Sequence, residues 1–311
     1  MSVPSHAKSI SFAAYGDTDV LRFGEAAVPE PGPGQVLLRV QAAGVNPLDW
    51  KLRQGLMEAV FPVAFPHVPG LEASGTVAAV GPGVTAWKVG DEVFGPVAGG
   101  YAEYATADAG KLAARPEDLD RETAAALPVA AEAATRALGL LGLAAGETLL
   151  VHAAAGAVGS LAVQFAVAAG ATVIGTAGEA NHDHLRALGA VPVGYGEGVF
   201  DRVREAAPQG VDAVLDAAGS GVLAGSVELV GGPERVVSLV NPAEAGPLGV
   251  RFSGGGPAED RTADALAAAV ALHRAGTLVA PIRAALPLAD AAAAHRLSEQ
   301  GHGLGKITLL P

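Results

Sequence analysis

The chain has 311 residues, which is enough for two domains that each bury a hydrophobic core. Its formal net charge of −12 at pH 7 argues against nucleic acid or an anionic membrane surface as a partner. Because the sequence contains no cysteine, disulfides, thiolate nucleophiles and cysteine-ligated zinc are excluded.

The first part of the chain contains short strands and turns. Apolar or alternating runs are separated by Pro- and Gly-rich turns, as is typical of antiparallel strands. We therefore predict a compact, mainly antiparallel β domain over residues 1–124. Its strands are predicted at residues 9–12, 36–42, 75–80 and 92–94.

From about Arg121 onwards, helical patterns alternate with apolar strands. This alternation predicts a doubly wound parallel sheet with right-handed crossovers over residues 125–255. Strands are predicted at 149–152, 171–176, 191–193, 211–217 and 235–240, and helices at 122–141 (apart from Pro128), from the turn at 153–157 to about 169, and at 182–188, 199–206 and 221–229. The final segment, 256–311, is predicted to contain helices at 261–275 and 288–298 and a strand at 306–310.

A strand, small-residue turn, helix and second strand follow one another over residues 147–178. The turn contains Ala154-x-Gly156-x-x-Gly159, a dinucleotide-binding fingerprint with Ala in place of the first Gly. Small residues let the backbone approach a pyrophosphate, to which the helix N-terminus offers free N–H groups and a partial positive charge. An Ala/Gly-rich core helix is the alternative, but the flanking strands supply the required context. We predict nucleotide binding.

Residues 149–178 carry no charged side chain and are long enough to imitate a membrane span. Gly and Ala interrupt this run, which divides into two strands and a helix, as expected for a buried parallel sheet. The first twelve residues, MSVPSHAKSISF, lack the long apolar core of a signal peptide. We expect a soluble, cytoplasmic protein without a membrane partner.

Several motifs occur together: AAGVNPLDWK at 42–51, HVPGLEASG at 67–75, VGDEV at 89–93, GYAEY at 100–104, AALP at 125–128 and the closing Gly305-Lys306. With the nucleotide-binding stretch, they resemble the medium-chain dehydrogenase/reductase superfamily along the whole chain, and within it the zinc-independent quinone oxidoreductase (zeta-crystallin-like) group. The resemblance implies an α/β fold, with a Rossmann doubly wound parallel sheet plus a GroES-like, mainly antiparallel β domain that the C-terminal segment completes. It also implies an active site in the cleft between the domains and a homodimer.

Zinc alcohol dehydrogenases of this superfamily bind their catalytic metal through two Cys and one His. In the matching positions this chain has Asn46 for the first Cys and Leu71 for the His, and it has no Cys for the second. We expect no metal. Hydride addition to a simple ketone then leaves an unaided alkoxide, whereas a quinone gives a phenolate-type anion whose conjugate acid has a pKa of about 10. Quinones are expected first as acceptors, and conjugated enals or enones next.

The resemblance places the segment from Asn46 to Lys51 in the substrate cleft, and the candidate catalytic residues are Asn46, Asp49 and Lys51. Asn46 is expected to donate hydrogen bonds there, the alternative being a turn residue before Pro47. Some relatives carry a Tyr near the position of Lys51 that has been proposed to donate a proton. We hypothesise that Lys51 polarises the substrate carbonyl or a cofactor hydroxyl. The alternative is a surface Lys paired with Asp49.

Candidate cofactor contacts lie in the turn and after the strands that follow. They are Ala154, Ala155, Gly156, Ala157, Val158 and Gly159 in the turn and helix start, Thr176, Gly178, Asn181 and Tyr195 after the second and third strands, and Ala218, Ser238, Leu239 and Val240 after the fourth and fifth. Relatives usually carry Thr near the nicotinamide where this chain has Ala133. Either Thr135 substitutes for it or that contact is missing.

Cofactor choice depends on the end of the second strand, where NAD-preferring relatives place an Asp that binds the ribose 2′-hydroxyl. The aligned residue is Ala177, which leaves room for a 2′-phosphate, so we predict NADPH rather than NADH. Glu179 lies 20 residues after Gly159, where an NAD-type acid is sought, but we interpret it as facing solvent. His182 and Arg186 are further candidate phosphate donors.

Together these patterns predict a zinc-free, NADPH-dependent oxidoreductase that transfers hydride to a quinone or an α,β-unsaturated carbonyl, a small electrophilic molecule. One alternative is a biosynthetic enoyl reductase with a bulky or thioester-bound substrate. Another is an NADPH-binding structural or sensing protein without turnover. Tyr101, Tyr104 and His152 are interpreted as packing or structural residues.

Overall fold

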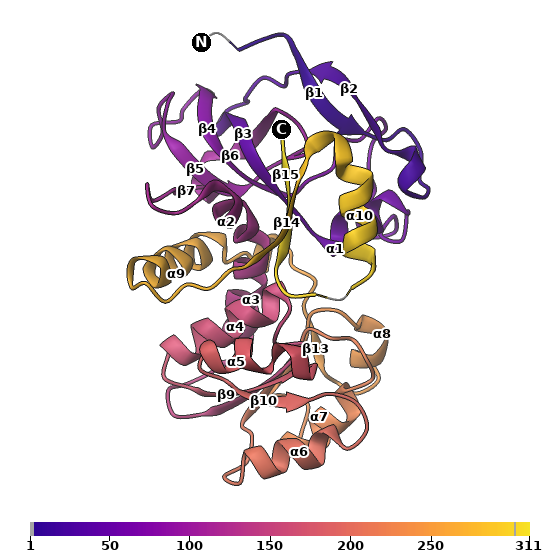
Figure 1. The fold of residues 1–311 in the computed structure, drawn as a ribbon, viewed down its shortest axis with the longest axis vertical. Coiled ribbons are helices and arrows are strands. Elements are labelled where there is room, and N and C mark those ends of the chain that lie inside the picture. Colours follow the sequence, from indigo (N-terminus) through magenta and orange to yellow (C-terminus); the bar gives the residue numbers. More distant parts are fainter. Residues whose placement is uncertain (1–2, 302) are drawn as a thin grey trace. The chain divides into compact units, whose positions relative to one another are not determined.

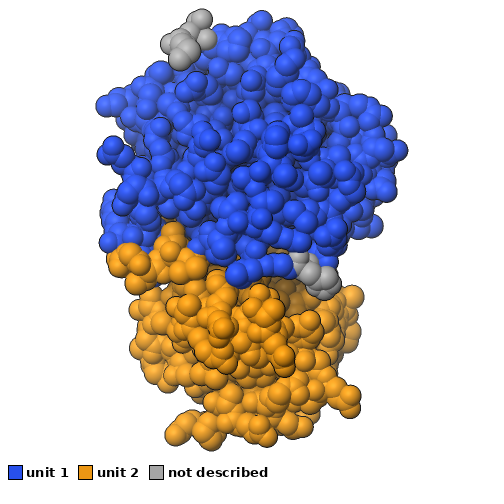
Figure 2. Space-filling model, viewed as in Figure 1, with its two compact units in different colours: residues 1–129, 269–274, 280–311 blue, residues 130–268, 275–279 orange. Residues whose placement is uncertain are grey.

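The computed structural model describes residues 3–301 and 303–311. The chain divides into two compact units (Figures 1 and 2). Unit 1 comprises residues 1–129, 269–274 and 280–311, and unit 2 comprises residues 130–268 and 275–279. The domain bounds drawn from the sequence, 1–124, 125–255 and 256–311, stay a prediction.

Unit 1 is built on a sheet with the strand order β14-β15-β3-β4-β5-β7, and β6 also pairs with β3. The C-terminal strand β15 pairs antiparallel with β3, while β14 pairs parallel with β15. The last residues of the chain therefore belong to the same sheet as its first half. The strands are β3 (Gln35–Val45), β4 (Glu72–Val80), β5 (Glu92–Pro96), β6 (Tyr104–Asp108), β7 (Ala113–Ala114), β14 (Ile282–Pro287) and β15 (Lys306–Leu310).

A two-stranded antiparallel sheet and several helices accompany this sheet. Strands β1 (His6–Ser11) and β2 (Arg22–Ala27) form the small sheet. Helix α1 (Pro47–Arg53) follows β3 directly and contacts α10 (Ala291–Glu299), since Arg53 Nη2 lies 2.7 Å from Glu299 Oε1. Short 3-10 turns occupy Thr18–Val20, Ala109–Lys111 and Leu288–Asp290.

The helix predicted over residues 122–141 is divided in two at Pro128. Helix α2 (Arg121–Ala126) ends just before this residue, and α3 (Pro128–Leu141) begins with it. Proline has no N–H to donate and its fixed φ suits the first position of a helix, so it starts a helix more readily than it continues one.

The core of unit 1 consists mainly of small aliphatic side chains. Val36, Leu38 and Val40 of β3 are at most 5% exposed and belong to the same buried cluster as Leu288 and Ala291 from the C-terminal segment. Burying one Val or Leu side chain contributes about 1.5–3 kcal/mol. Apolar burial therefore holds the C-terminal segment in place, together with strand pairing.

Within the described residues, unit 2 contains a six-stranded parallel sheet with the order β10-β9-β8-β11-β12-β13. Numbered from the first strand of the unit, this is the order 3-2-1-4-5-6 of doubly wound dinucleotide-binding folds. The predicted fold class is confirmed. The strands are β8 (Thr148–His152), β9 (Thr172–Ala177), β10 (Val191–Gly194), β11 (Ala213–Asp216), β12 (Val236–Ser238) and β13 (Arg251–Phe252).

Helices connect these strands, and the sheet is buried. Leu150, Ile174, Val214 and Val236, from four neighbouring strands, are fully buried in one cluster, which explains their continuously apolar sequences. No helix in the described part of the chain is long and apolar enough to cross a membrane. The remaining helices are α4 (Ala157–Ala168), α5 (His182–Ala187), α6 (Val199–Ala206), α7 (Leu223–Val230), α8 (Pro242–Ala245) and α9 (Thr262–Arg274), with 3-10 turns at Glu179–Asn181 and Pro257–Glu259.

Short or irregular elements escaped prediction from the sequence. Strand β13 has only two residues, both exposed, so it carries no apolar pattern. Strand β14 is nowhere fully buried, and α8 is a single turn. Such elements are determined by their neighbours in space, which a local pattern does not report.

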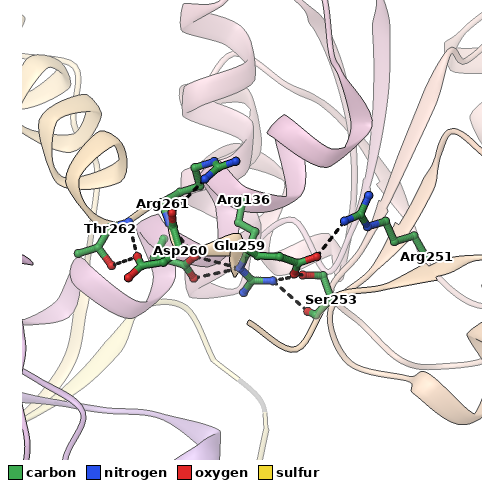
Figure 3. Close-up of polar contacts among 8 residues, drawn as sticks. Arg136, Arg251, Ser253, Glu259, Asp260, Arg261 and Thr262 are labelled. Carbon is green, nitrogen blue, oxygen red and sulfur yellow. Dashed lines mark hydrogen bonds and ion pairs between the residues drawn. The ribbon is translucent and has the colours of Figure 1, made fainter. Parts of the chain in front are cut away.

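Arg136 connects helix α3 to the segment that follows β13 (Figure 3). This arginine is 6% exposed; its Nε donates to Glu132 Oε1 at 2.9 Å, and its Nη1 donates to the carbonyl and hydroxyl oxygens of Ser253. The Ser253 hydroxyl donates to Glu259, which also pairs with Arg251. A buried guanidinium with these partners fixes the loop after β13.

We expect Arg136→Met to lower the free energy of unfolding of unit 2 by about 3 kcal/mol, because the variant leaves the Ser253 carbonyl without its donor and Glu132 without its ion-pair partner. Chemical denaturation measures the effect. Arg186→Met is the matched control: Arg186 is 59% exposed and pairs with the exposed Asp183, so its loss should cost no more than about 0.5 kcal/mol. Equal losses in the two variants would contradict the role of Arg136.

Candidate active site

The turn between β8 and α4 brings the backbone unusually close to itself. Ala153 has φ 58°, in the left-handed region, and Gly156 then caps α4 in an extended conformation. A Cβ on Gly159 would lie 2.3 Å from the carbonyl oxygen of Ala153, so only glycine fits there. Ala154 and Ala155 are buried, whereas Gly156 is exposed at the helix N-terminus. Its missing side chain leaves the N–H groups of Ala157, Val158 and Gly159 in the first turn without a side-chain cap.

Thr176 and His152 support this turn from within the sheet. The Thr176 hydroxyl accepts from Ala153 N at 3.2 Å, and its carbonyl accepts from Ala154 N at 3.0 Å. His152 bridges Thr176 and the hydroxyl of Ser226 at 3.3 and 3.2 Å, and burial lowers its pKa to about 4. His152 is therefore a neutral structural residue. Thr176, a candidate phosphate donor, is 2% exposed and holds the turn.

A groove of about 810 Å³ lies beyond the carboxyl ends of β9 and β10. Gly178, Glu179 and Tyr195 line it, as does Arg202 from α6. Tyr195 is 69% exposed, and its ring edge lies 3.6 Å from the position of a Cβ on Gly178. Two of the predicted candidates, Gly178 and Tyr195, thus face each other in one groove.

The other predicted phosphate donors are placed differently. Asn181 ends a 3-10 turn before α5 and does not line the groove. His182 lines it, with Nε2 3.3 Å from the Ala177 carbonyl. Arg186 pairs with Asp183 on the exposed surface of α5. Glu179 is exposed, as expected, yet it forms part of the groove wall.

The ends of β11 and β12 form one connected patch around the fully buried Asp216. Its Oδ1 accepts from Ala218 N at 2.9 Å, its Oδ2 accepts from the Ser238 hydroxyl at 2.8 Å, and its carbonyl accepts from Leu239 N. The Ser238 hydroxyl also accepts from Val240 N. Ser238 is itself fully buried and braces the backbone, whereas Ala218 and Val240 are exposed.

In unit 1, Asn46 and Asp49 form the start of helix α1. Asn46 precedes Pro47, the first helical residue, and its N–H donates to Asp49 Oδ2 at 2.8 Å. This is the reciprocal half of a capping box, in which the third helical residue reaches back to the cap. Both side chains are buried, at 4% and 0% exposure. Asn46 is thus a helix cap and also part of a buried network.

Glu72, on β4, is the centre of that network. Its Oε1 accepts from Asn46 Nδ2 at 2.8 Å and from Lys306 Nζ, and its Oε2 accepts from Val129 N at 2.8 Å. The Lys306 ammonium also donates to Asn46 Oδ1 and to the Val45 carbonyl, so all three of its protons have acceptors. These bonds fix the orientation of the Asn46 amide.

Asp49 lies at the buried end of the same cluster. The Tyr101 hydroxyl donates to its Oδ2 at 3.0 Å, while Oδ1 has no hydrogen-bond partner among the described residues. Burial raises the pKa of Asp49 to about 7, and the charge of Glu72 adds to the rise, against the Asn46 and Tyr101 hydrogen bonds and the Lys306 charge. Burial is the main cause that raises the pKa of Tyr101 well above its usual value, and the neighbouring Asp49 adds to the rise. The Tyr101 hydroxyl therefore keeps its proton.

Lys51 is only half-buried and lies on the same helix. Its Nζ is 5.6 Å from the ring centroid of Trp50, and no described carboxylate pairs with it. In particular, Asp49 bonds to Asn46 and Tyr101 and not to Lys51. The alternative in which Lys51 pairs with Asp49 on the surface is therefore wrong.

Comparisons with known proteins match both parts of the chain. Residues 32–117 match the model of the alcohol dehydrogenase GroES-like domain, and residues 188–309 match that of the zinc-binding dehydrogenase family. The chain is similar to a quinone oxidoreductase of Sus scrofa, with 33% identity over 95% of each protein. The chain belongs to the medium-chain dehydrogenase/reductase superfamily, in its quinone oxidoreductase group.

Two further relatives are informative. An NADPH-dependent alkenal/one oxidoreductase of Arabidopsis thaliana is 36% identical over 81% of this chain and 66% of that protein. A mycobacterial protein solved in complex with NADPH is 31% identical, with a TM-score of 0.83 over 98% of this chain and 100% of that one. The chain spans 59% and 66% of the lengths of the first two curated relatives that it matches.

A dehydrogenase of this superfamily raises the question of metal ligands. The family resemblance predicts that Asn46 and Leu71 occupy the positions of a Cys and a His in the zinc enzymes of the superfamily. In the part of the chain that the structure describes, no group of three or more His, Asp or Glu side chains is placed to hold a metal ion. The polar group beside the Asn46 side chain is the Lys306 ammonium, which donates to Asn46 Oδ1.

Sequence reasoning missed Glu72, Lys306, Asp216 and Arg202 as members of the site. Glu72 and Lys306 are each the first residue of a mainly apolar strand, which is the one local signal that two opposite charges are buried together. Asp216 likewise ends an apolar strand. Arg202 lies in an amphipathic helix and carries no such signal.

Asp49→Asn tests the buried carboxyl. Folded Asp49 holds its proton up to about pH 7, whereas the unfolded chain releases it near 3.8, so the free energy of unfolding should fall as pH rises between these values. The full effect is on the order of 4 kcal/mol. We expect the free energy of unfolding of the unsubstituted protein, minus that of the variant, to decline by this amount between pH 4 and 7. Chemical denaturation at several pH values measures it.

Other titrating groups are shared by both proteins and cancel in this difference. His152 and His295, whose burial lowers their pKa values, act with the opposite sign, since they cost stability as the pH falls. A difference that does not change with pH would show that Asp49 is ionised in the folded protein.

Proposed function

We propose that the protein is an NADPH-dependent oxidoreductase that reduces quinones or α,β-unsaturated carbonyl compounds. The observation that carries the proposal is the match over 95% of both chains to a quinone oxidoreductase, in a chain whose nucleotide-binding turn keeps Gly156 and Gly159. The relative named alkenal/one oxidoreductase supports enones as acceptors. The enzyme names of these relatives favour turnover over a purely structural role.

The residues of unit 2 fit a dinucleotide. Gly159 lets the chain fold tightly enough to expose the N-terminus of α4, whose first N–H groups would bind the pyrophosphate. The exposed backbone at Ala218 and Val240, braced by Asp216 and Ser238, would hold the rest of the cofactor. The groove beside Tyr195 would receive the adenosine end. When bound, the reduced nicotinamide supplies a hydride.

In unit 1, Lys51 is the proposed electrophile. Hydride arriving at an acceptor places negative charge on its carbonyl oxygen, and a fixed ammonium stabilises that charge. Lys51 is half-buried and has no carboxylate partner among the described residues, so its charge is available to a ligand. The capping bonds of Asp49 and the bonds of Glu72 to Asn46 would fix the helix that carries it.

Four finer properties are also proposed. The replacement of zinc ligands by Asn46 and Leu71, with no cysteine in the sequence, supports chemistry without zinc. The NADPH in the mycobacterial complex and in the name of the Arabidopsis relative supports NADPH over NADH. A homodimer in the cytoplasm is proposed from the family resemblance and the composition.

We expect the purified protein to oxidise NADPH with an ortho-quinone, a para-quinone or a small alkenal, and to do so at least tenfold more efficiently than NADH. The absorbance of reduced nicotinamide measures both rates. An excess of a zinc chelator should leave the rate unchanged. No turnover with any acceptor, despite NADPH binding, would contradict the proposed function.

Lys51→Met tests the electrophile. Loss of the ammonium should lower kcat/KM for a small enone about 100- to 1,000-fold, because removing one positioned charge-stabilising donor costs this much in other enzymes. The effect on a quinone should be smaller, since its reduced anion is far less basic. Lys88→Met, at an exposed lysine of the same unit, is the control and should leave both values unchanged. An unchanged kcat/KM for every acceptor in Lys51→Met would rule the role out.

A further inference from the structure

The loop between β10 and α6 is folded around one side chain. The loop sequence is Gly194-Tyr195-Gly196-Glu197-Gly198, and two of its glycines have left-handed φ values, 92° at Gly196 and 72° at Gly198. Its carbonyl groups converge on the guanidinium of Arg202. Nε and Nη2 donate to the Gly194 carbonyl at 3.1 and 2.9 Å, Nη1 donates to the Glu197 carbonyl at 2.9 Å, and Nη2 donates to the Tyr195 carbonyl at 3.3 Å.

These bonds hold Arg202 without neutralising it. All of its acceptors are neutral carbonyl oxygens, and no described carboxylate forms an ion pair with it. An arginine stays charged at any physiological pH. A full positive charge is therefore held rigidly at the wall of the groove, and with the hydrogen bonds assigned above one Nη1 hydrogen remains for a ligand.

The remaining charges of the groove wall are acidic. Glu179, Glu197 and Glu205 line it together with Arg202. Three carboxylates repel a phosphate, and Glu179 also stands where an acid would accept a hydrogen bond from a ribose 2′-hydroxyl. Without the charge of Arg202, this groove would favour a nucleotide that has no 2′-phosphate.

Arg202 also determines where Tyr195 lies. The arginine binds the carbonyl of Tyr195 itself and those of its neighbours at 194 and 197, so it fixes the backbone on both sides of the ring. The Tyr195 hydroxyl then lies 3.8 Å from the position of a Cβ on Gly178, directly across the groove at the end of β9. A phenol in this place is a hydrogen-bond donor to a ligand bound there.

We propose that Arg202 is the specificity-determining residue of this groove, because its charge and its hold on Tyr195 make the groove select a nucleotide that carries a 2′-phosphate. This inference rests on the proposed use of NADPH. Arg202 acts partly through Tyr195, as a positioning residue, and partly through its own charge.

The experiment measures binding of nucleotide fragments and needs no turnover. Calorimetry on the full-length protein compares adenosine 2′,5′-bisphosphate with adenosine 5′-monophosphate, which differ only in the 2′-phosphate. We expect the bisphosphate to bind about tenfold or more tightly, the contribution of one or two hydrogen bonds to a charged group. Arg202→Met should bring this ratio close to one and change the dissociation constant of the monophosphate less than about threefold.

Further variants separate charge from positioning. Arg202→Lys keeps the charge without the fork of donors, and it should restore part of the ratio. Tyr195→Phe removes one hydroxyl while leaving the loop carbonyls and Arg202 in place, and it should lower the ratio about threefold. Glu179→Gln removes an opposing charge and should raise it. Arg204→Met, on the same helix but paired with Asp201 on the surface, should leave it unchanged.

Several results would overturn the inference. An unchanged ratio in Arg202→Met would do so, as would an equal loss for both fragments, which indicates a structural role only. Binding of neither fragment, or no preference in the unsubstituted protein, would also overturn it. The proposed function is tested separately. A ratio that depends on Arg202 in a protein without turnover would support the inference and contradict the oxidoreductase. Turnover with a ratio that Arg202→Met leaves unchanged would support the oxidoreductase and contradict the inference.

Discussion

A buried carboxylate is the constraint around which unit 1 is arranged. Glu72 is fully buried, and a buried charge is tolerated only when opposite charge and hydrogen bonds surround it. Its partners come from the cap of α1, the start of α3 and the C-terminal strand β15. Gly44 must lack a side chain, since a Cβ there would lie 2.2 Å from Glu72 Oε1. The same bonds that satisfy Glu72 orient Asn46 and the helix that carries Lys51.

Unit 2 is governed by a steric constraint of a similar kind. The turn after β8 closes only because Gly159 has no side chain and because Ala153 adopts a left-handed conformation, held by Thr176. In both units, buried polar side chains support the structure. The groups left to bind ligands are exposed backbone groups in unit 2 and Lys51 in unit 1. This division explains why several conspicuous polar residues, Asn46, Asp49 and Thr176 among them, prove to be buried supports.

The sequence was sufficient for the fold and for the nucleotide-binding turn, because both depend on local patterns: alternating strands and helices, and small residues at fixed spacing. The sequence did not show which polar side chains are buried. Asn46 was expected in a cleft, but it is buried and bonded to Lys306, whose partner Glu72 lies 234 positions away in the chain. The contacts of Arg202 depend on the conformation of a glycine-rich loop, which a periodic sequence pattern does not predict. Local patterns identified the segments, and long-range contacts decided the roles of their side chains.

The most direct measurement follows the hydride. The protein would be supplied with NADPH that carries deuterium at the transferable C4 position, together with a small enone, and the product examined by nuclear magnetic resonance. We predict one deuterium on the β-carbon of the saturated ketone, with one NADPH consumed for each product molecule. Product without deuterium would contradict direct hydride transfer, as would bound NADPH that reduces neither the enone nor a quinone.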